Sequence, residues 1–486
     1  MKPASAYSLD NVSNFHRLSF AFPLKQRSAL FSLLGMLAVA ACESSSDDSS
    51  PAAGGNATTG GRGGTTAQGG GAHAGAGAAG AAHAGSAGSL AGGNAGQAGS
   101  KPDAGGAGGD AGVGNEAGAV NEAGAAGNAG AAGEGGAPPS TGREFVYVSR
   151  ILGGILSCSI DADGAPALLP GGPIRPAGHA TSLAVDPSQK FVYVGDEDNH
   201  VYVFRIGADG SLPAEPSSSV ATPDNPIGLA IEPKGRFVYV ASDQGTAIYT
   251  FAIDTESGAL TAVGEPLLVG DEPDHSAPAF IAAEPSGHFV YISQRAEQGI
   301  RGYEIEQASG ALSELDGSPF AATGLPDGDN LFGGAIVFKA SGDFAFTSGG
   351  ALNAFSLDPD SGKLTLVEGS PFTLDVQSDQ NAPNLAIDPQ GKYVYATHFL
   401  ANNHVSGFKI DPQNGKLEAV PDSPITALAP YSVGVGPSGR FVYVGEDLPE
   451  MSVYRLSRQT GAMTPLPDSP FMFGGLEVKL AFAVLP

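Results

Sequence analysis

The stretch GPSGRFVYVGED, residues 436–447, joins a Pro-Ser-Gly turn to a run of alternating aromatic and β-branched residues. Such a run, bounded by turn residues, predicts a short β-strand. The same combination returns along the chain with small changes. Related copies begin at Asp186, Glu232, Glu284, Lys339 and Asp388, and a truncated copy, REFVYVSR, begins at Arg143. One unit is therefore present seven times, and its repetition decides the fold.

The spacing of the copies identifies the kind of repeat. The aromatic residue that opens each strand core recurs every 46 to 55 residues, at Phe145, Phe191, Phe237, Phe289, Phe344, Tyr393 and Phe441. One unit contains four expected strands, at 229–233, 237–241, 247–254 and 260–268. Four short antiparallel strands per repeat of this length are typical of propeller blades. The sequence predicts an all-β, seven-bladed propeller over residues 143–486.

The truncated first copy predicts how the ring closes. REFVYVSR has no LAxDP strand before it, whereas the sequence ends in LAFAVLP. Aligned on the proline, residues 483–486 match residues 184–187. The last strand is therefore expected to become the inner strand of the first blade, which leaves only short outer edges open to aggregation.

A second motif, the hairpin turn of the SGAL type, also occurs seven times. Its glycine suits a turn position with positive φ and is expected to be structural. The seven are Gly164, Gly210, Gly258, Gly310, Gly362, Gly415 and Gly461. Acidic residues in these turns, such as Asp358 and Asp360, lack the spacing of an EF-hand and are interpreted as turn formers.

The first 41 residues have the pattern of an export signal. Lys25 and Arg27 precede an apolar run over 29–41, which is shorter than the roughly 20 residues that span a bilayer. The run ends in Val-Ala-Ala-Cys, which resembles a bacterial lipobox, so Cys42 is the expected lipidation site. The residue after it is Glu43 rather than the aspartate that retains lipoproteins in the inner membrane of some Gram-negative bacteria. We expect an exported, lipid-anchored protein of the outer membrane of a Gram-negative bacterium.

Residues 42–142 form a Gly/Ala-rich segment with almost no large apolar side chains. Such a segment cannot bury enough surface to offset its ordering entropy, so a disordered tether is expected. The formal net charge is −26, which disfavours nucleic acid and anionic membrane as partners. Membrane association is expected only through the lipid, and the protein is expected to be a monomer. The remaining cysteine, Cys158, lies in an alternating run and is predicted to be a buried core residue.

The repeats resemble a known family. Their cores, of the DPSQKFVYV type, and the unit ends SGALSELDGSPF (309–320), SGKLTLVEGSPF (361–372) and TGAMTPLPDSPF (460–471) are similar to those of the lactonase-type seven-bladed propellers. That family includes 6-phosphogluconolactonases and 3-carboxymuconate cyclases. The resemblance covers 143–486 and implies a lactone hydrolase or cyclase that acts on a small lactone or sugar.

In a propeller, the loops after the second and fourth strands gather on one face around the channel. A lactone-opening site needs a base and a donor or cation for the developing oxyanion. Arg295 resembles a loop arginine of the family, and Arg150 occupies the same loop of the first blade. With His275 as base, these are the expected catalytic residues. The expected substrate-binding residues on the same face are His179, Asp196, His398, Glu446 and Asp447.

The sequence also departs from the family. Members often carry a histidine where the inner strand begins, and the matching positions here are Thr181, Ile227, Ala279, Pro383 and Tyr431. The loop face is instead rich in carboxylates. A non-catalytic surface propeller that binds a glycan, a cation or a protein therefore remains the alternative to an exported lactonase-like enzyme. No cofactor is expected, and calcium at DEDNH, 196–200, is only a minor option because clustered loop acids are usually solvated.

Overall fold

The computed structural model describes residues 142–150, 154–174, 179–242, 246–269, 278–294, 299–322, 334–348, 352–372, 384–398, 403–446, 450–473 and 477–486. All of them belong to one compact unit of the chain. Within these ranges the secondary structure consists of strands and turns. No helix long and apolar enough to cross a membrane occurs among the described residues.

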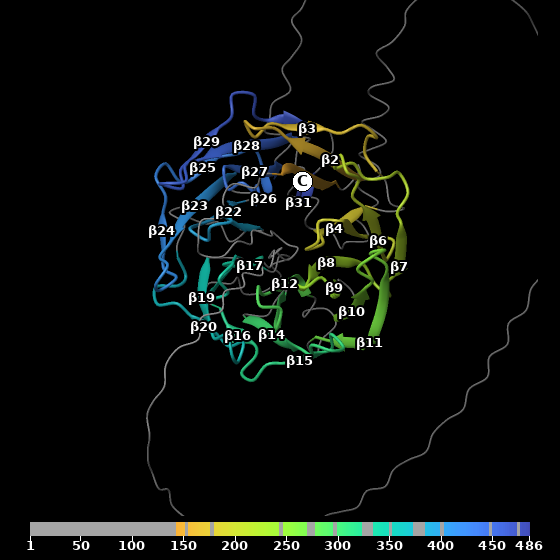
Figure 1. Cartoon of the computed structure of the whole chain (residues 1–486). Coiled ribbons are helices and arrows are strands. Elements are labelled where there is room, and N and C mark those ends of the chain that lie inside the picture. Colours follow the sequence, from red (N-terminus) through yellow and green to blue (C-terminus); the bar gives the residue numbers. More distant parts are fainter. Residues whose placement is uncertain are drawn as a thin grey trace, which may run out of the picture. The chain divides into compact units, whose positions relative to one another are not determined.

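The strands form seven antiparallel sheets around a central axis, which confirms the predicted seven-bladed propeller (Figure 1). Blade 1 contains β31 (Glu477–Leu485), β1 (Arg143–Arg150), β2 (Gly154–Ile160) and β3 (Pro166–Leu168). Blade 2 contains β4 (Ala180–Val185), β5 (Phe191–Asp196), β6 (His200–Arg205) and β7 (Ser218–Ala221). Blade 3 contains β8 (Pro226–Ile231), β9 (Phe237–Ser242), β10 (Ala247–Ile253) and β11 (Leu260–Leu268).

The other four blades repeat this order from the axis outward. Blade 4 contains β12 (Pro278–Ala283), β13 (Phe289–Gln294), β14 (Gly299–Ile305), β15 (Leu312–Glu314) and β16 (Phe320–Ala321). Blade 5 contains β17 (Ile336–Phe338), β18 (Phe344–Thr347), β19 (Asn353–Leu357) and β20 (Leu364–Leu366). Blade 6 contains β21 (Leu385–Ile387), β22 (Tyr393–His398), β23 (His404–Ile410), β24 (Leu417–Ala419) and β25 (Ile425–Thr426). Blade 7 contains β26 (Pro430–Val435), β27 (Phe441–Glu446), β28 (Glu450–Leu456), β29 (Met463–Pro465) and β30 (Phe471–Met472).

Ring closure follows the prediction, with one correction of register. The last strand, β31, pairs antiparallel with β1 and forms the inner strand of blade 1. Phe145 of blade 1 and Phe191 of blade 2 are equivalent residues. Phe145 pairs with Ala483, whereas Phe191 lies beside Asp186, whose N–H donates to the Phe191 carbonyl. The proline-based alignment is therefore wrong by two residues. A two-residue shift leaves the same side chains on the same face of a strand, so the strand was assigned correctly.

The core lies between neighbouring blades and follows from the alternation of the second strands. Val192 and Val194 of β5 pack with Phe145 and Tyr147 of blade 1, while Tyr193 points to the other side and packs with blade 3. Seven clusters of this kind fill the seven interfaces. Cys158 is fully buried in one of them, which confirms the prediction for this residue.

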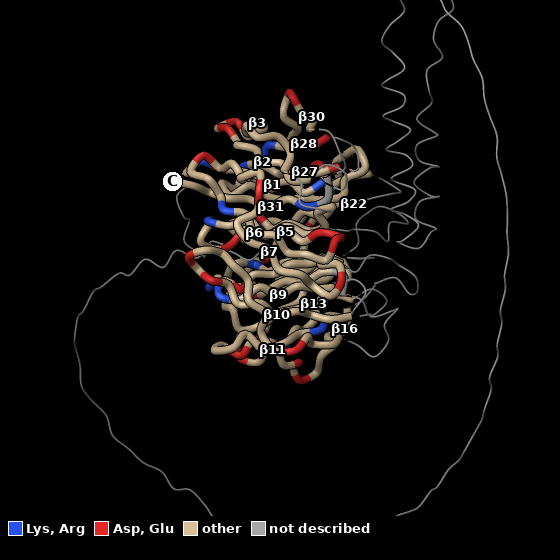
Figure 2. Tube along the Cα trace, turned by 90° about the vertical axis from the view of Figure 1, so that its right-hand side faces the viewer, with Lys and Arg blue, Asp and Glu red and all other residues tan. Residues whose placement is uncertain are grey.

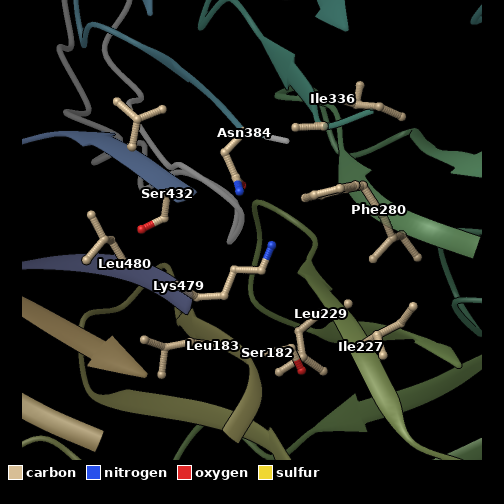
Figure 3. Close-up of a pocket in the computed structure, with 14 residues that line it drawn as sticks. Ser182, Leu183, Ile227, Leu229, Phe280, Ile336, Asn384, Ser432, Lys479 and Leu480 are labelled. Carbon is tan, nitrogen blue, oxygen red and sulfur yellow. The ribbon is translucent and has the colours of Figure 1, made fainter. Parts of the chain in front are cut away.

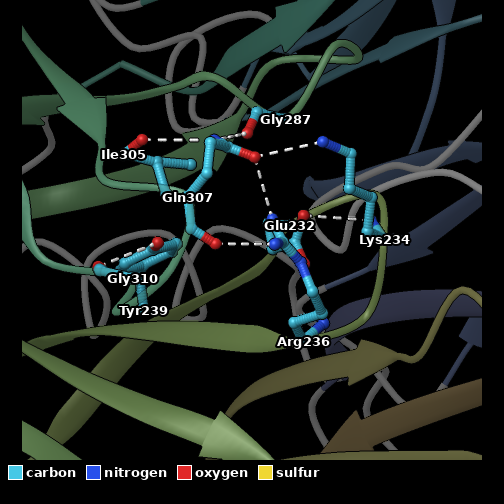
Figure 4. Close-up of polar contacts among 8 residues, drawn as sticks. All are labelled: Glu232, Lys234, Arg236, Tyr239, Gly287, Ile305, Gln307 and Gly310. Carbon is cyan, nitrogen blue, oxygen red and sulfur yellow. Dashed lines mark hydrogen bonds and ion pairs between the residues drawn. The ribbon is translucent and has the colours of Figure 1, made fainter.

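Hydrogen bonds from the turn motifs link each blade to the next. The hydroxyl of Tyr239 donates to the carbonyl of Gly310, 3.1 Å away in the next blade (Figure 4). Tyr147, Tyr193, Tyr291, Tyr395 and Tyr443 make the same bond. The turn before the strand is held by a carboxylate, since Glu232 accepts the N–H groups of Lys234 and Arg236. Arg236 then reaches the carbonyl of Gln307 in blade 4 at 2.7 Å.

The structure confirms the predicted role of the hairpin glycines and adds a second reason for them. Gly310 has a φ of +77°, a conformation that favours glycine. A Cβ at this position would also lie 2.5 Å from the ring of Phe237 in the preceding blade. Glycine is therefore needed both for the backbone conformation of the turn and for its close packing against the aromatic ring of the preceding blade. At the acidic turn tips, the Asp358 carboxylate accepts the N–H groups of Asp360 and Ser361, as expected of a turn former.

Candidate functional site

One residue from the inner edge of each blade faces the axis at the same level. The backbone of each of these residues pairs with the penultimate residue of the repeated FVYVxx-type core. The seven are Ser182, Gly228, Phe280, Ala335, Asn384, Ser432 and Lys479. With their apolar neighbours they surround a cavity of about 50 Å³ in the channel.

This cavity lies toward the end of the propeller where the predicted site residues are found. Lys479 pairs with Ser149, the residue before Arg150, and Ser182 pairs with Gly195, the residue before Asp196. The level of the cavity is thus one residue below the ends of the second strands. The cavity and the predicted site residues therefore lie toward the same end of the propeller.

The inner strands are irregular beside the cavity. The pairing register shifts between Ala180 and Ser182 and at the equivalent points of β8, β12, β26 and β31. The extra residues in β4, β8, β12 and β26 are Thr181, Ile227, Ala279 and Tyr431, four of the positions where related propellers often carry histidine. An extra residue of this kind re-aims nearby side chains and is common beside functional sites. The side chain of Thr181 donates its hydroxyl hydrogen to the Pro226 carbonyl at 2.6 Å.

Lys479 is the one titratable residue among the described residues that line the cavity. Its side chain extends from β31 into the open centre of the channel (Figure 3). The Nζ atom lies 4.3 Å from the centre of the Phe280 ring, across the channel on β12. An ammonium over an aromatic face at this distance makes a favourable cation–π contact.

The surroundings of Lys479 weaken its charged form. Part of the side chain remains accessible from the channel, but the apolar walls remove most of the water around the ammonium group. This desolvation lowers the pKa of Lys479 to about 8. No ion pair with Lys479 is formed by the described carboxylates. The group is therefore a cation at neutral pH that lacks a nearby counter-charge within the described part of the chain.

The other polar groups that the described residues contribute to the cavity are neutral. The Asn384 side chain points toward the open centre, as Lys479 does (Figure 3), and its Nδ2 donates to the Tyr431 carbonyl at 2.7 Å. Ser182 donates to the Pro226 carbonyl at 2.8 Å. The buried Oγ of Ser432 has no hydrogen-bond partner in the described structure. One cation and a few amide and hydroxyl groups can bind and polarise a carbonyl or hold a carboxylate.

The described residues predicted from the sequence lie at this end but outside the cavity. Arg150, Asp196, His398 and Glu446 share one position, the last residue of the second strand, and all are buried. None of them is among the residues that line the cavity. The same is true of His179, whose Nδ1 lies 3.0 Å from Oε1 of Glu197. A position at this end of the propeller therefore does not by itself place a side chain in the lining of the cavity.

Their contacts explain what holds them. Arg150 donates from an Nη atom to the Phe473 carbonyl at 3.0 Å in blade 7. Asp196 accepts the N–H of His200 at 3.2 Å across its hairpin. Both side chains stabilise the strand ends from which the loops begin.

His398 and Glu446 have unusual environments. The ring of His398 stacks on that of His404 with centroids 4.5 Å apart. Burial, aided by the neighbouring His404, lowers the pKa of His398 to about 3. Burial likewise raises the pKa of Glu446 to about 7, although a 2.5 Å hydrogen bond from Ser452 opposes this shift. Glu446 can therefore exchange a proton near neutral pH, but its carboxylate is hydrogen-bonded to Ser452 within blade 7 and does not line the cavity.

Three further predicted site residues, Arg295, His275 and Asp447, lie outside the described residues, as does the predicted lipidation site Cys42. Among the described residues, no three His, Cys, Asp or Glu side chains come together as metal ligands. In the DEDNH stretch, the contacts are local ones, such as that of His200 Nδ1 with the Asp198 carbonyl at 2.8 Å.

A family model supplies the classification. The model of the lactonase seven-bladed β-propeller family matches residues 177–324 and 335–476. The chain belongs to this family. The match covers blades 2 to 7 of this lactonase-family propeller. Blade 1, which is closed by β31 and carries Lys479, lies outside the matched residues.

Solved structures agree on the fold. A putative 6-phosphogluconolactonase from Bacteroides fragilis is similar to this lactonase-family propeller at 21% identity with a TM-score of 0.60, over 71% of this chain and 100% of its own. A periplasmic gluconolactonase from Pseudomonas aeruginosa has 20% identity and a TM-score of 0.59, over 71% and 100% of the two chains. At these identities the likeness concerns the fold alone. A comparison with curated proteins gives no match.

Proposed function

We propose that the protein is an exported, lipid-anchored hydrolase that opens a small lactone in the cavity at Lys479. The observation that carries this proposal is the Lys479 ammonium, which extends into the channel without a nearby carboxylate among the described residues. Family membership and the position of the cavity support it. Because residues 1–41 resemble an export signal and Cys42 a lipidation site, we expect the proposed reaction to take place outside the cytosol, which disfavours a role on a cytosolic phosphosugar.

In the proposed reaction, Lys479 donates an N–H to the lactone carbonyl oxygen. Water adds to the carbonyl carbon, and the C=O electron pair moves onto that oxygen, where the ammonium stabilises the negative charge. The carbonyl then re-forms as the C–O bond of the ring breaks, and the proton given up by the added water passes to the ring oxygen, which becomes a hydroxyl group. The product is a hydroxy acid. The apolar walls strengthen the contact with the developing oxyanion because they exclude competing water.

The charged form of Lys479 is the active one in this scheme. With a pKa of about 8, the ammonium is present below pH 8 and is lost as the pH rises through that value. The enzyme-catalysed rate, corrected for uncatalysed hydrolysis, should therefore fall above pH 8. Loss of a single oxyanion donor typically costs about 10²–10³ in rate.

A lactone panel tests the proposal. Acid release from sugar, aliphatic and muconate-type lactones would be measured with purified full-length protein, Lys479→Met and the control Lys409→Met, which replaces an exposed lysine of β23. We expect turnover of at least one lactone, a loss of about 100-fold or more in Lys479→Met, and no change in the control. The absence of turnover on every lactone, or full activity in Lys479→Met, would contradict the proposed reaction.

A further inference from the structure

We infer that the cavity at Lys479 is a binding site for one small carboxylate, and that the ring-opened hydroxy acid remains bound there after the reaction. The second half of this inference rests on the proposed function, whereas the first half does not. If the first half holds, the channel binds small carboxylates whether or not the protein hydrolyses a lactone.

The charge of the cavity favours an anionic ligand. Among the described residues, the lining contains one cation and no anion. Keeping an ammonium group away from water is costly unless an anion or several hydrogen-bond acceptors compensate for it. The cation–π contact with Phe280 contributes about 0.5–2 kcal/mol, which offsets only part of such a cost. A carboxylate ligand supplies the missing charge directly.

The neighbouring strands do not supply that charge among the described residues. The strands packed against β31 are β1, β4, β26 and β27. Near this end their titratable residues are Arg150, Tyr431 and Glu446, and none of them lines the cavity. The side chain of Glu477 lies outside the described residues. Glu446 titrates near pH 7 but forms its hydrogen bond with Ser452 inside blade 7.

The second argument is shape. The Lys479 and Asn384 side chains both point into the open centre of the channel (Figure 3). One donor of Asn384 is used by the Tyr431 carbonyl. No described residue accepts its second amide hydrogen, which can therefore be donated to a ligand oxygen. A cavity of about 50 Å³ has room for roughly three or four water-sized groups, which matches a carboxylate with its first carbon.

The third argument concerns which anion fits. A phosphate dianion is usually recognised by arginine or by several donors and cations together. The described lining residues offer a single lysine and no guanidinium group. The described site therefore favours a monoanionic carboxylate over a phosphate, although solved structures of similar fold include one named a putative 6-phosphogluconolactonase.

Binding and protonation must then be linked. A carboxylate that binds the ammonium form raises the pKa of Lys479, and its affinity falls as the pH rises above the pKa of the free protein. With that pKa near 8, affinity should fall by roughly 100-fold between pH 7 and pH 10. The carboxylate itself stays ionised over this range.

Calorimetric titration of the purified full-length protein tests the inference. The probes are gluconate, the neutral sorbitol of the same carbon length, and inorganic phosphate, each at pH 7 and pH 10. We expect gluconate to bind at pH 7, to bind about 100-fold more weakly at pH 10, and to outcompete phosphate, while sorbitol does not bind. Lys479→Met should lose gluconate binding, and Lys409→Met should keep it.

Each other outcome overturns part of the inference. Equal gluconate binding by wild type and Lys479→Met, or no binding at pH 7 by folded protein, would remove the carboxylate site. Tighter binding of phosphate than of gluconate would overturn the preference for a monoanion. Gluconate binding without turnover of any lactone would contradict the proposed hydrolase while leaving the carboxylate site in place, so the two failures can be told apart.

Discussion

A chain that lacks residues 480–486 is expected to lose the folded propeller. These residues form most of β31, which pairs with β1 along its whole length. Leu480, Ala483 and Leu485 are buried, and burial of a large apolar side chain contributes about 1.5–3 kcal/mol. Their loss, together with the strand pairing, is comparable with the whole stability of a domain, about 5–15 kcal/mol. Deletion also exposes β1 as an unpaired edge.

The control is deletion of Pro486 alone, an exposed residue beyond the end of β31. Thermal unfolding followed by circular dichroism should show a cooperative transition for the wild type and for this control. The chain without 480–486 should show none at 25 °C or above. A truncated chain with an unchanged melting temperature would mean that β31 does not close the ring.

The second large effect is a loss of stability in acid caused by His398. The folded pKa of about 3 lies below the ordinary value of 6.5. Between these values the unfolded chain binds a proton that the folded chain excludes. Stability therefore falls as the pH drops from 6.5 toward 3, and this group has no effect above that window. The shift corresponds to roughly 4–5 kcal/mol at the acid end.

Replacement of His398 by phenylalanine keeps an aromatic ring against His404 but removes the titration. Urea unfolding between pH 7 and pH 3 should show a smaller acid loss for His398→Phe than for the wild type. The control is His288→Phe, in which an exposed histidine is replaced, and its pH dependence should follow the wild type. If His398→Phe keeps the full pH dependence, the buried neutral state of His398 is wrong.

The repeats made the architecture predictable. The alternation that places Val192 and Tyr193 on opposite faces of β5 is visible in the letters FVYV, and sevenfold repetition left few alternatives. The turn glycines were predicted from φ alone. Their contact with the preceding blade, such as Gly310 against Phe237, depends on packing between units and has no local signal.

Lys479 was missed for two physical reasons. Functional residues of a propeller are expected in its loops, whereas Lys479 lies within a strand whose following residues are all apolar. Alignment of the last strand on its proline also makes Ala481, rather than Lys479, the equivalent of Ser182. The reason is that the proline after the last strand lies two residues farther along than the proline after β4 does. The observed register puts Lys479 at the level of Ser182. The equivalence of Lys479 and Ser182 is visible only from the strand pairing.

For the charged residues that end the second strands, the sequence indicated the position along the strand but not the direction of the side chain. Arg150, Asp196, His398 and Glu446 end the second strands of their blades. Sequence spacing could not show that they face neighbouring blades, because the direction of a strand's last side chain depends on the pleat. Acidic residues are spread over turns around the domain (Figure 2), so their abundance does not mark the channel.

The titration of Lys479 tests the central claim most directly. Competitive acylation of the full-length protein with an amine-specific reagent, analysed by mass spectrometry across pH 6–11, gives the pKa of each lysine. The account predicts a value of about 8 for Lys479 and protection of this residue by gluconate. An ordinary lysine value for Lys479, with no protection by gluconate, would contradict a desolvated, ligand-binding cation in the channel.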